Sequence, residues 1–221
     1  ILLLGGALQG WAAPGVRSEL EVNVPPQGLT ELDLKNEICL YQGYNGTLVE
    51  VLVKEPRMRL TAQKVRYDQG AQLLTAEQAV KLETEKMVAT GAKMILTPTL
   101  ARLPAGGEII ALEPEGWKLV VAGDFSYSLA EEAFQGAGGF SLLGPKWMLE
   151  GEYFEGNLLK GVMTARGEQL QFCYGETRGA AGKISYQQKD EQMILTDSPL
   201  IYWENGFLRG EAETVIIYDL V

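Results

Sequence analysis

Two stretches of the chain carry the same order of apolar and polar positions. Residues 64–97 and 183–218 each contain an apolar-x-Tyr triplet, a turn, an apolar-Leu-Thr triplet, an alternating run and a glycine. Apolar and polar residues alternate with a period of two, which places the apolar side chains on one face of a β-strand. The repetition indicates a fold that uses one set of short strands twice.

The two copies predict which positions are structurally equivalent. The predicted pairs are Val65 with Ile184, Tyr67 with Tyr186, Leu74 with Leu195, Thr75 with Thr196, Val80 with Ile201, Leu82 with Trp203, Glu83 with Glu204, Gly91 with Gly210, Met94 with Val215, and Leu96 with Ile217. The positions between them are mostly polar, such as Lys64 and Arg66 in the first copy, and a solvated face is the expected role of such a set.

Turn signals predict an all-β protein. The chain has 26 glycines and 9 prolines, scattered rather than clustered, as many tight turns require. Asn45-Gly46 suits a type I′ turn, which predicts a hairpin within residues 38–53. The best candidate for a helix is the short run 128–139, which its glycines end.

A chain of 221 residues has room for one large β domain or two small ones. The predicted boundary lies in residues 98–116, which have loop composition with one short strand at Glu108–Leu112. We therefore expect a first β unit at residues 14–112 and a second, continuous with it, at residues 113–221.

The amino-terminal run allows three interpretations. Small residues before Ala13-Pro14 are typical of a signal-peptide cleavage site after Ala12, so residues 1–13 are interpreted as a signal-peptide remnant. The alternatives are the tail of an uncleaved inner-membrane anchor and a first buried strand. The run is too short to span a bilayer by itself. Export to the periplasm is the expectation.

The amino-acid composition argues against several functions. A net charge of −10 provides no basic face for nucleic acid. The chain has no histidine, and its serines and glycines form no nucleophile elbow or phosphate loop, so we expect neither an enzyme nor a cofactor or metal. Acidic pairs such as Glu150 and Glu152 are expected on the solvent-exposed face of a strand. Cys39 and Cys173 are either a disulfide or two separate thiols.

The phrase that begins at Arg59, RLTAQKVRYDQGAQLLTAEQAVKL, and its partner from Ile184 resemble the OstA-like family of periplasmic lipopolysaccharide-transport proteins, the LptA and LptC type. The resemblance covers about a third of the chain; its corner glycine is replaced by Ala62 or Ala76 and by Asp197. It implies a twisted β-jelly roll with an open apolar groove that holds the acyl chains of lipopolysaccharide or a related glycolipid. It also implies end-to-end strand pairing with other OstA-like proteins.

An apolar sheet face that stays unsealed offers a slot for acyl chains. The proposed groove lining consists of Val65, Tyr67, Leu74, Val80, Leu82, Met94, Leu96, Ile184, Tyr186, Leu195, Ile201, Trp203, Val215 and Ile217. The same side chains would otherwise fill a closed core. The apolar terminal strand predicts an assembly edge at Thr214, Ile216, Tyr218 and Leu220. The alternative function is a structural envelope protein that self-associates through strand edges and binds no lipid.

Overall fold

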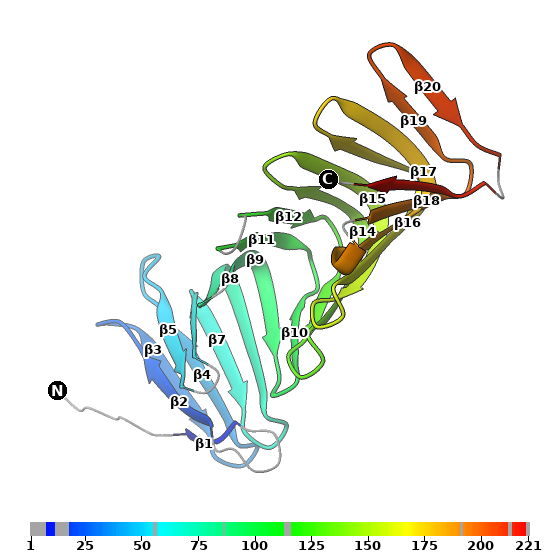
Figure 1. The fold of residues 1–221 in the computed structure, drawn as a ribbon. Coiled ribbons are helices and arrows are strands. Elements are labelled where there is room, and N and C mark those ends of the chain that lie inside the picture. Colours follow the sequence, from blue (N-terminus) through cyan, green and yellow to red (C-terminus); the bar gives the residue numbers. More distant parts are fainter. Residues whose placement is uncertain are drawn as a thin grey trace. The chain divides into compact units, whose positions relative to one another are not determined.

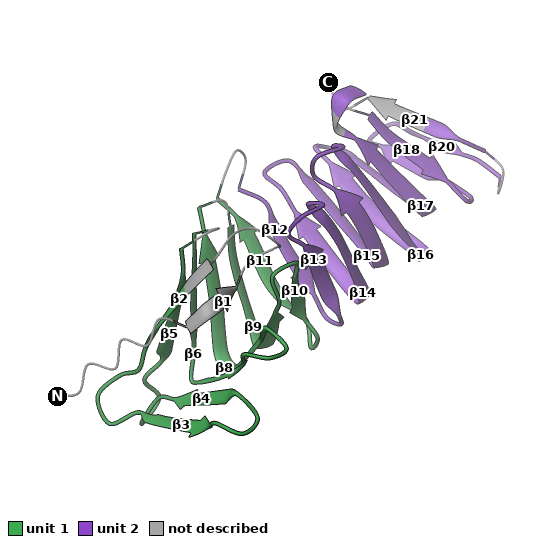
Figure 2. Ribbon diagram, turned by 90° about the horizontal axis from the view of Figure 1, so that it is seen from below, with its two compact units in different colours: residues 1–113 green, residues 114–221 purple. Residues whose placement is uncertain are grey.

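A computed structural model describes residues 8–11, 18–54, 57–85, 87–112, 116–190, 192–211 and 214–219. The chain divides into two compact units, residues 1–113 and 114–221 (Figure 2). Apart from one turn of 3-10 helix at Gln188–Asp190, the regular structure of these described residues is antiparallel β-sheet. The predicted all-β class is confirmed.

Unit 1 is built from strands that form two layers (Figure 1). Its strands are β1 (Leu8–Trp11), β2 (Ser18–Asn23), β3 (Leu29–Asp33), β4 (Ile38–Gln42), β5 (Val49–Val53), β6 (Met58–Ala62), β7 (Lys64–Asp68), β8 (Leu73–Thr84), β9 (Met87–Leu96), β10 (Leu100–Leu103) and β11 (Gly107–Ala111).

The long strands β8 and β9 belong to both layers of unit 1. In the first layer, β1, β2, β5 and β6 follow one another in the ladder, and β6 pairs with residues 81–84 of β8. In the second layer, β3, β4 and β7 do the same, and β7 pairs with residues 73–77 of β8. Alternate residues of both layers are buried, such as Val51 and Val65 at 0% exposure. The layers therefore enclose one apolar core.

A bend in the backbone joins the two layers of unit 1. Gln78 and Ala79 interrupt β8 with positive φ angles of 66° and 53°. The amide of Gln63, between β6 and β7, donates a hydrogen bond of 2.9 Å to the carbonyl oxygen of Gln78. The amide of Gly43 donates in turn to the carbonyl oxygen of Gln63 at 2.8 Å. The bend is thus a continuous line of backbone hydrogen bonds across neighbouring strands.

Unit 2 repeats this plan with longer strands. They are β12 (Lys118–Val121), β13 (Phe125–Ser128), β14 (Ala133–Leu143), β15 (Trp147–Asn157), β16 (Val162–Tyr174), β17 (Thr177–Gln187), β18 (Gln192–Thr196), β19 (Leu200–Trp203), β20 (Gly206–Arg209) and β21 (Ile216–Asp219). Strands β14 to β17 bend between the layers; β12, β19 and β20 complete one layer, and β13, β18 and β21 the other.

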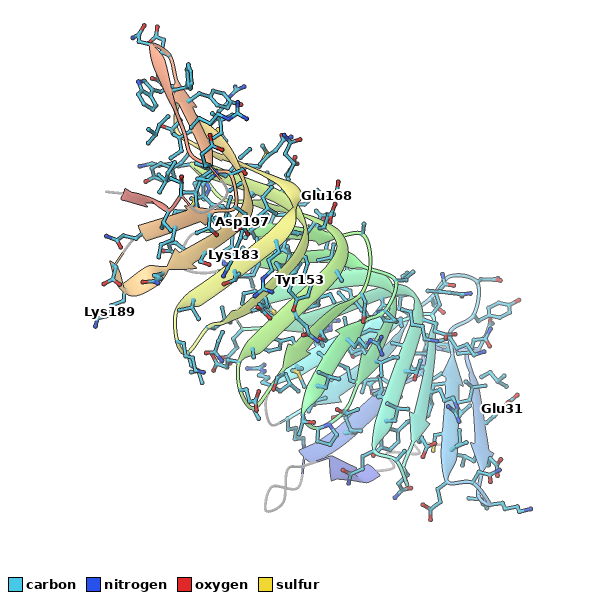
Figure 3. The ribbon with its side chains drawn as sticks, turned by 90° about the vertical axis from the view of Figure 1, so that its right-hand side faces the viewer. Glu31, Tyr153, Glu168, Lys183, Lys189 and Asp197 are labelled. Atoms are coloured by element: carbon cyan, nitrogen blue, oxygen red, sulfur yellow. The ribbon has the colours of Figure 1, made fainter. Side chains whose placement is uncertain are left out.

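The bend of unit 2 depends on glycine and on short polar residues. Gly138 and Gly139 have φ angles of 90° and 102°, which side chains other than glycine rarely permit. Asp197 and Ser198 hold the equivalent place between β18 and β19, with φ angles of 61° and 60°. Figure 3 shows Tyr153, Lys183 and Asp197 following one another across the strands along this bend.

The structure confirms the internal repeat and corrects its register. Val65 and Ile184 are 119 positions apart, and the same offset relates Tyr67 to Tyr186 and Gly91 to Gly210, as predicted. Tyr67 pairs with Leu74, however, whereas Tyr186 pairs with Met193. Leu74 is therefore equivalent to Met193, and the predicted match with Leu195 is wrong by two residues. A slip of two keeps the same face, which is why the sequence pattern did not reveal it.

The predicted match between the last strands of the two copies is wrong by one residue. Unlike a slip of two residues, this error exchanges the inner and outer faces of the strand. Ala76 pairs with Met94 in unit 1, and Leu195, its equivalent, pairs with Ile216 in unit 2. Met94 and Ile216 are both buried, at 1% and 8% exposure. Val215, the predicted match of Met94, lies one position off and is 56% exposed, because a slip of one residue reverses every side chain.

The predicted hairpin within residues 38–53 is wrong, although its turn is correct. Asn45 and Gly46 have the positive φ angles, 49° and 82°, that a type I′ turn needs. The strands on either side do not pair with each other: β4 pairs with β3 and β7 in the second layer, and β5 with β2 and β6 in the first. The turn connects two layers instead of two neighbouring strands.

Two further local predictions need correction. Residues 128–139 are not a helix but a turn followed by β14, because Phe134 pairs with Tyr127 on one side and with Gly156 on the other. The predicted loop 98–116 contains β10 as well as β11, and both extend the layers beside β9. Ladder pairing has overridden weak local preference in both segments.

Within the predicted signal-peptide remnant, the structure describes only Leu8–Trp11. These residues form β1, which pairs with β2 through Leu8 with Leu20 and Gln9 with Glu19. This corresponds to the third interpretation, a strand of the fold. The proposed cleavage site after Ala12 lies outside the described residues, and export stays a prediction.

Candidate functional site

The residues predicted to line a groove in unit 1 form its packed core. Each is at most 2% exposed: Val65, Tyr67, Leu74, Val80, Leu82, Met94 and Leu96. They lie on the inner faces of β7, β8 and β9, as the predicted parity requires. The structure thus brings them together but leaves none of them accessible to water. A ligand would reach them only if the two layers move apart.

In unit 2 the predicted lining residues divide into two groups. Ile184, Leu195 and Ile201 are buried, at 2%, 0% and 4% exposure. Tyr186 is half-buried, and the side chain of Ile217 lies outside the described residues. Val215, on the reversed parity, and Trp203, which is 48% exposed, are not part of the core. The inward parity predicted for Val215 is therefore off by one residue, while the predicted place of Trp203 in the lining of a groove stays a prediction.

Trp203 nevertheless lies on the inner face of its strand. It is two residues from the buried Ile201 on β19, so both side chains point to the same side of the sheet. Leu208 on β20 pairs directly with Ile201 and is 50% exposed. The apolar inner face of unit 2 therefore continues into solvent at the β19–β20 hairpin.

The outer face of this hairpin is apolar as well. Tyr202 and Phe207 form a cross-strand pair and are 43% and 71% exposed. Sequence reasoning identified Trp203 alone, although the alternation in Leu200–Arg209 contained a signal for the others.

The inner face of unit 1 also reaches solvent, at strand β3. Every described side chain of β3 is exposed. Leu32, at 59% exposure, pairs with the buried Cys39, and Thr30 pairs with the buried Tyr41. Leu32 is thus the exposed end of an otherwise buried row. The sequence analysis missed it because its partner strand was assigned to another hairpin.

A cluster of polar atoms interrupts the apolar interior of unit 1. Cys39 and Tyr67 are cross-strand neighbours, and Tyr41 is two residues from Cys39 on the same face of β4. The Cys39 thiol interacts with the Tyr41 hydroxyl. Burial raises the pKa of both tyrosines, and the nearby Cys39 thiol raises it further. Tyr67 Oη is buried without a hydrogen-bond partner. We call Cys39, Tyr41 and Tyr67 the unit 1 polar cluster.

Charged side chains occupy the outer faces. Lys93 Nζ lies 2.8 Å from Glu77 Oε1, and Lys81 Nζ lies 2.6 Å from Glu83 Oε1. Hydrogen bonding to these lysines lowers the pKa of Glu77 and of Glu83. Arg59 adds ion pairs to the same surface. The polar parity of the repeat is therefore a solvated face, as the sequence predicted.

The predicted assembly edge is partly described. Thr214 is half-buried, Ile216 is buried against β18, and Tyr218 pairs with Met193. Leu220 lies outside the described residues. Among the strands that the structure describes, β21 pairs only with β18 and β20 only with β19, so both have one free edge. End-to-end pairing through these edges stays a prediction.

Cys39 and Cys173 are free thiols in the structure, one in each unit. The described residues contain no group of histidine, cysteine, aspartate and glutamate side chains that is arranged to hold a metal ion.

Within the ranges that the structure describes, no helix is long and apolar enough to cross a membrane.

No protein-family model matches the chain, and no curated protein matches it. The resemblance to the OstA-like family therefore stays a prediction from the repeat.

Proposed function

We propose that the chain is a non-enzymatic carrier or bridge for lipid, of the OstA-like type, which holds acyl chains between the two layers of its units. The observation that carries this proposal is the apolar inner face that reaches solvent. In unit 2 it runs from the buried Ile201 to the exposed Trp203 and Leu208, and in unit 1 from the buried Cys39 to the exposed Leu32.

The hydrogen bonding of the layers supports entry of a hydrocarbon chain. In each unit, the described backbone hydrogen bonds that join the two layers lie along the bend. No strand pairing is described between the margins of the two layers opposite the bend, so separating these margins breaks no described ladder. An acyl chain placed there gains about 0.8 kcal/mol for each methylene that it buries. That gain offsets the loss of contacts between the layers.

The cargo and the partners follow from the resemblance and from charge. A chain of net charge −10 does not attract anionic lipid through its outer face, so the acyl chains must supply the affinity. Lipopolysaccharide or a related glycolipid is the cargo that we propose, and the periplasm is the place. Other OstA-like proteins would join the free strand edges and continue the apolar face.

Two adjacent residues provide a sharp test. Leu32 and Glu31 are neighbours on the exposed strand β3 and point to opposite faces. A photo-crosslinking side chain at Leu32 or at Trp203 should capture glycolipid in an envelope extract, whereas the same group at Glu31 should not. Mass spectrometry of the crosslinked species identifies the lipid. Equal capture from Leu32 and Glu31 would show that the lipid merely adheres to the surface.

A structural role without lipid is the second candidate, and the dense core favours it. Large side chains such as Leu170 and Leu195 are wholly buried, at 0% exposure. In this alternative the layers never separate, and the free edges of β20 and β21 join copies of the chain. Phe207→Lys should then abolish self-association in sedimentation, while lipid extraction of the purified protein yields nothing. Retained lipid in the purified protein would rule this alternative out.

A further inference from the structure

One row of side chains crosses the second layer of unit 1 from solvent to core. Ladder pairing places Leu32, Cys39, Tyr67, Leu74 and Leu96 beside one another on the inner face of β3, β4, β7, β8 and β9. Their exposure falls from 59% at Leu32 to 7% at Cys39 and 1% at each of the last three. A lipid chain that enters over Leu32 therefore meets Cys39 and then Tyr67.

The hydroxyl of Tyr67 is the exceptional atom of this row. It is buried and has no hydrogen-bond partner, while the neighbouring Tyr41 hydroxyl interacts with the Cys39 thiol. A buried hydroxyl without a partner destabilises a fold, so its retention here requires an explanation. A tyrosine at position 67, where phenylalanine would fill the same space without a hydroxyl, is explained if a bound ligand supplies the hydrogen-bond acceptor.

The second unit shows that the fold does not require this chemistry. The equivalent row consists of Met163, Tyr186 and Met193, which are paired across β16, β17 and β18. Met163 stands where unit 1 has Cys39, and Ala165 stands where it has Tyr41. The tyrosine ring recurs, but the thiol and the second hydroxyl do not. The unit 1 polar cluster is therefore a feature of one unit only.

The chemistry of the cluster selects a neutral acceptor. Every lysine and arginine of unit 1 that the structure describes lies outside the buried core. An anionic phosphate or carboxylate beside Tyr67 would have no countercharge and would be costly to bury. Both tyrosines stay protonated at neutral pH, so they act as donors. The partner must be an uncharged oxygen on an otherwise apolar molecule.

We infer that Tyr67 Oη donates a hydrogen bond to the ester or amide carbonyl of a bound acyl group, which makes unit 1 the place where the root of an acyl chain is held. This inference rests on the proposed lipid binding and extends it, because it distinguishes acylated lipids from plain hydrocarbon. Tyr67 is a binding residue in this scheme, and Cys39 and Tyr41 complete the polar surface around it.

The test uses the full chain, freed of lipid, with two probes of similar length. One is methyl palmitate carrying ¹³C at its carbonyl, and the other is octadecane. In the wild type, the infrared band of the labelled carbonyl should shift to lower wavenumber on binding, as a hydrogen bond requires. Tyr67→Phe should remove that shift and weaken methyl palmitate binding by about three- to tenfold. The affinity for octadecane should stay the same.

Tyr186→Phe is the matched control, because it removes the equivalent hydroxyl from the row without the cluster. It should keep both the carbonyl shift and the wild-type affinity. An unshifted carbonyl in the bound wild type overturns the inference without reference to any variant. If Tyr67→Phe weakens the affinity for octadecane and for methyl palmitate equally, the inference is overturned too, because the role of Tyr67 is then packing. If the wild type binds neither probe, the lipid-carrier proposal itself fails.

Discussion

The amide of Gly182 donates a hydrogen bond of 2.8 Å to the carbonyl oxygen of Asp197. The same bond joins Gln63 to Gln78 in unit 1, at 2.9 Å and at the same offset of 119 positions. Both bonds lie at the bend, where the chain passes from one layer to the other. The bend is therefore repeated in the two units, although the residues that form it differ.

Gly182→Ala should destabilise the protein. A Cβ atom at this position would lie 2.7 Å from Asp197 Cβ, which is closer than real Cβ atoms approach. We expect a loss of about 1–3 kcal/mol in the free energy of unfolding, measured by urea denaturation. Gln63→Ala, at the equivalent bend of unit 1, is the control and should cost less than about 0.5 kcal/mol. Equal losses would show that close approach at Gly182 is not the cause.

Phe154→Ala should be among the most damaging substitutions in unit 2. Phe154 is 1% exposed, and its ring centroid lies 4.7 Å from that of Phe140, 5.9 Å from Phe134 and 6.2 Å from Phe125. Loss of the ring leaves a cavity in this cluster, so we expect about 3–5 kcal/mol of destabilisation. Phe207→Ala, where the ring is 71% exposed, should change the urea midpoint little. Similar midpoints for the two variants would contradict the aromatic core.

Glu77→Gln should lower the free energy of unfolding slightly at neutral pH, and this difference from the wild type should disappear in acid. The ion pair with Lys93 lowers the pKa of Glu77 in the folded protein, so its stabilisation is present above the unfolded pKa and is lost as pH falls through the folded pKa. Both side chains are about 40% exposed, and solvent screening limits the effect to about 0.2–0.5 kcal/mol at pH 7. Urea midpoints of wild type and variant should coincide near pH 2. A difference that persists there would exclude the ion pair as the cause.

The buried tyrosines should make the protein sensitive to alkali. Burial raises the pKa of Tyr41 and Tyr67 in the folded state, so the unfolded chain loses these protons first. Their contribution is intact below the unfolded pKa of about 10 and falls as pH rises toward the folded values. Wild-type stability should decline between about pH 9 and 11, and Tyr41→Phe should decline less steeply. The two proteins should show the same pH dependence between about pH 6 and 8.

If Tyr41→Phe keeps the full wild-type decline in alkali, the burial of the Tyr41 hydroxyl is not what couples folding to pH. The other tyrosines whose pKa burial raises, Tyr127 and Tyr153, would then have to account for it. The corresponding phenylalanine variants separate these contributions.

Part of the candidate site followed from the sequence. The alternation in residues 64–97 placed Val65, Tyr67 and Leu82 on the inner face, where the structure has them at 0–2% exposure. The pattern gave no sign of the unit 1 polar cluster, because Cys39 and Tyr41 were assigned to a hairpin with β5. Their neighbour is instead β7, which follows β4 in the ladder but lies more than 20 positions along the chain.

The sequence by itself determined local geometry: the strands, the Asn45-Gly46 turn, the inner and outer parity, and the existence of a repeat. These depend on side-chain alternation and on the φ angles that glycine and asparagine permit, which are properties of a few neighbouring residues. Only the tertiary structure decided which strands pair, in what register, and which inner residues end in solvent at Leu32 and Trp203. Strands that are distant in the sequence can pair with the same strand edge, and a strand with one apolar face fits several such partners equally well.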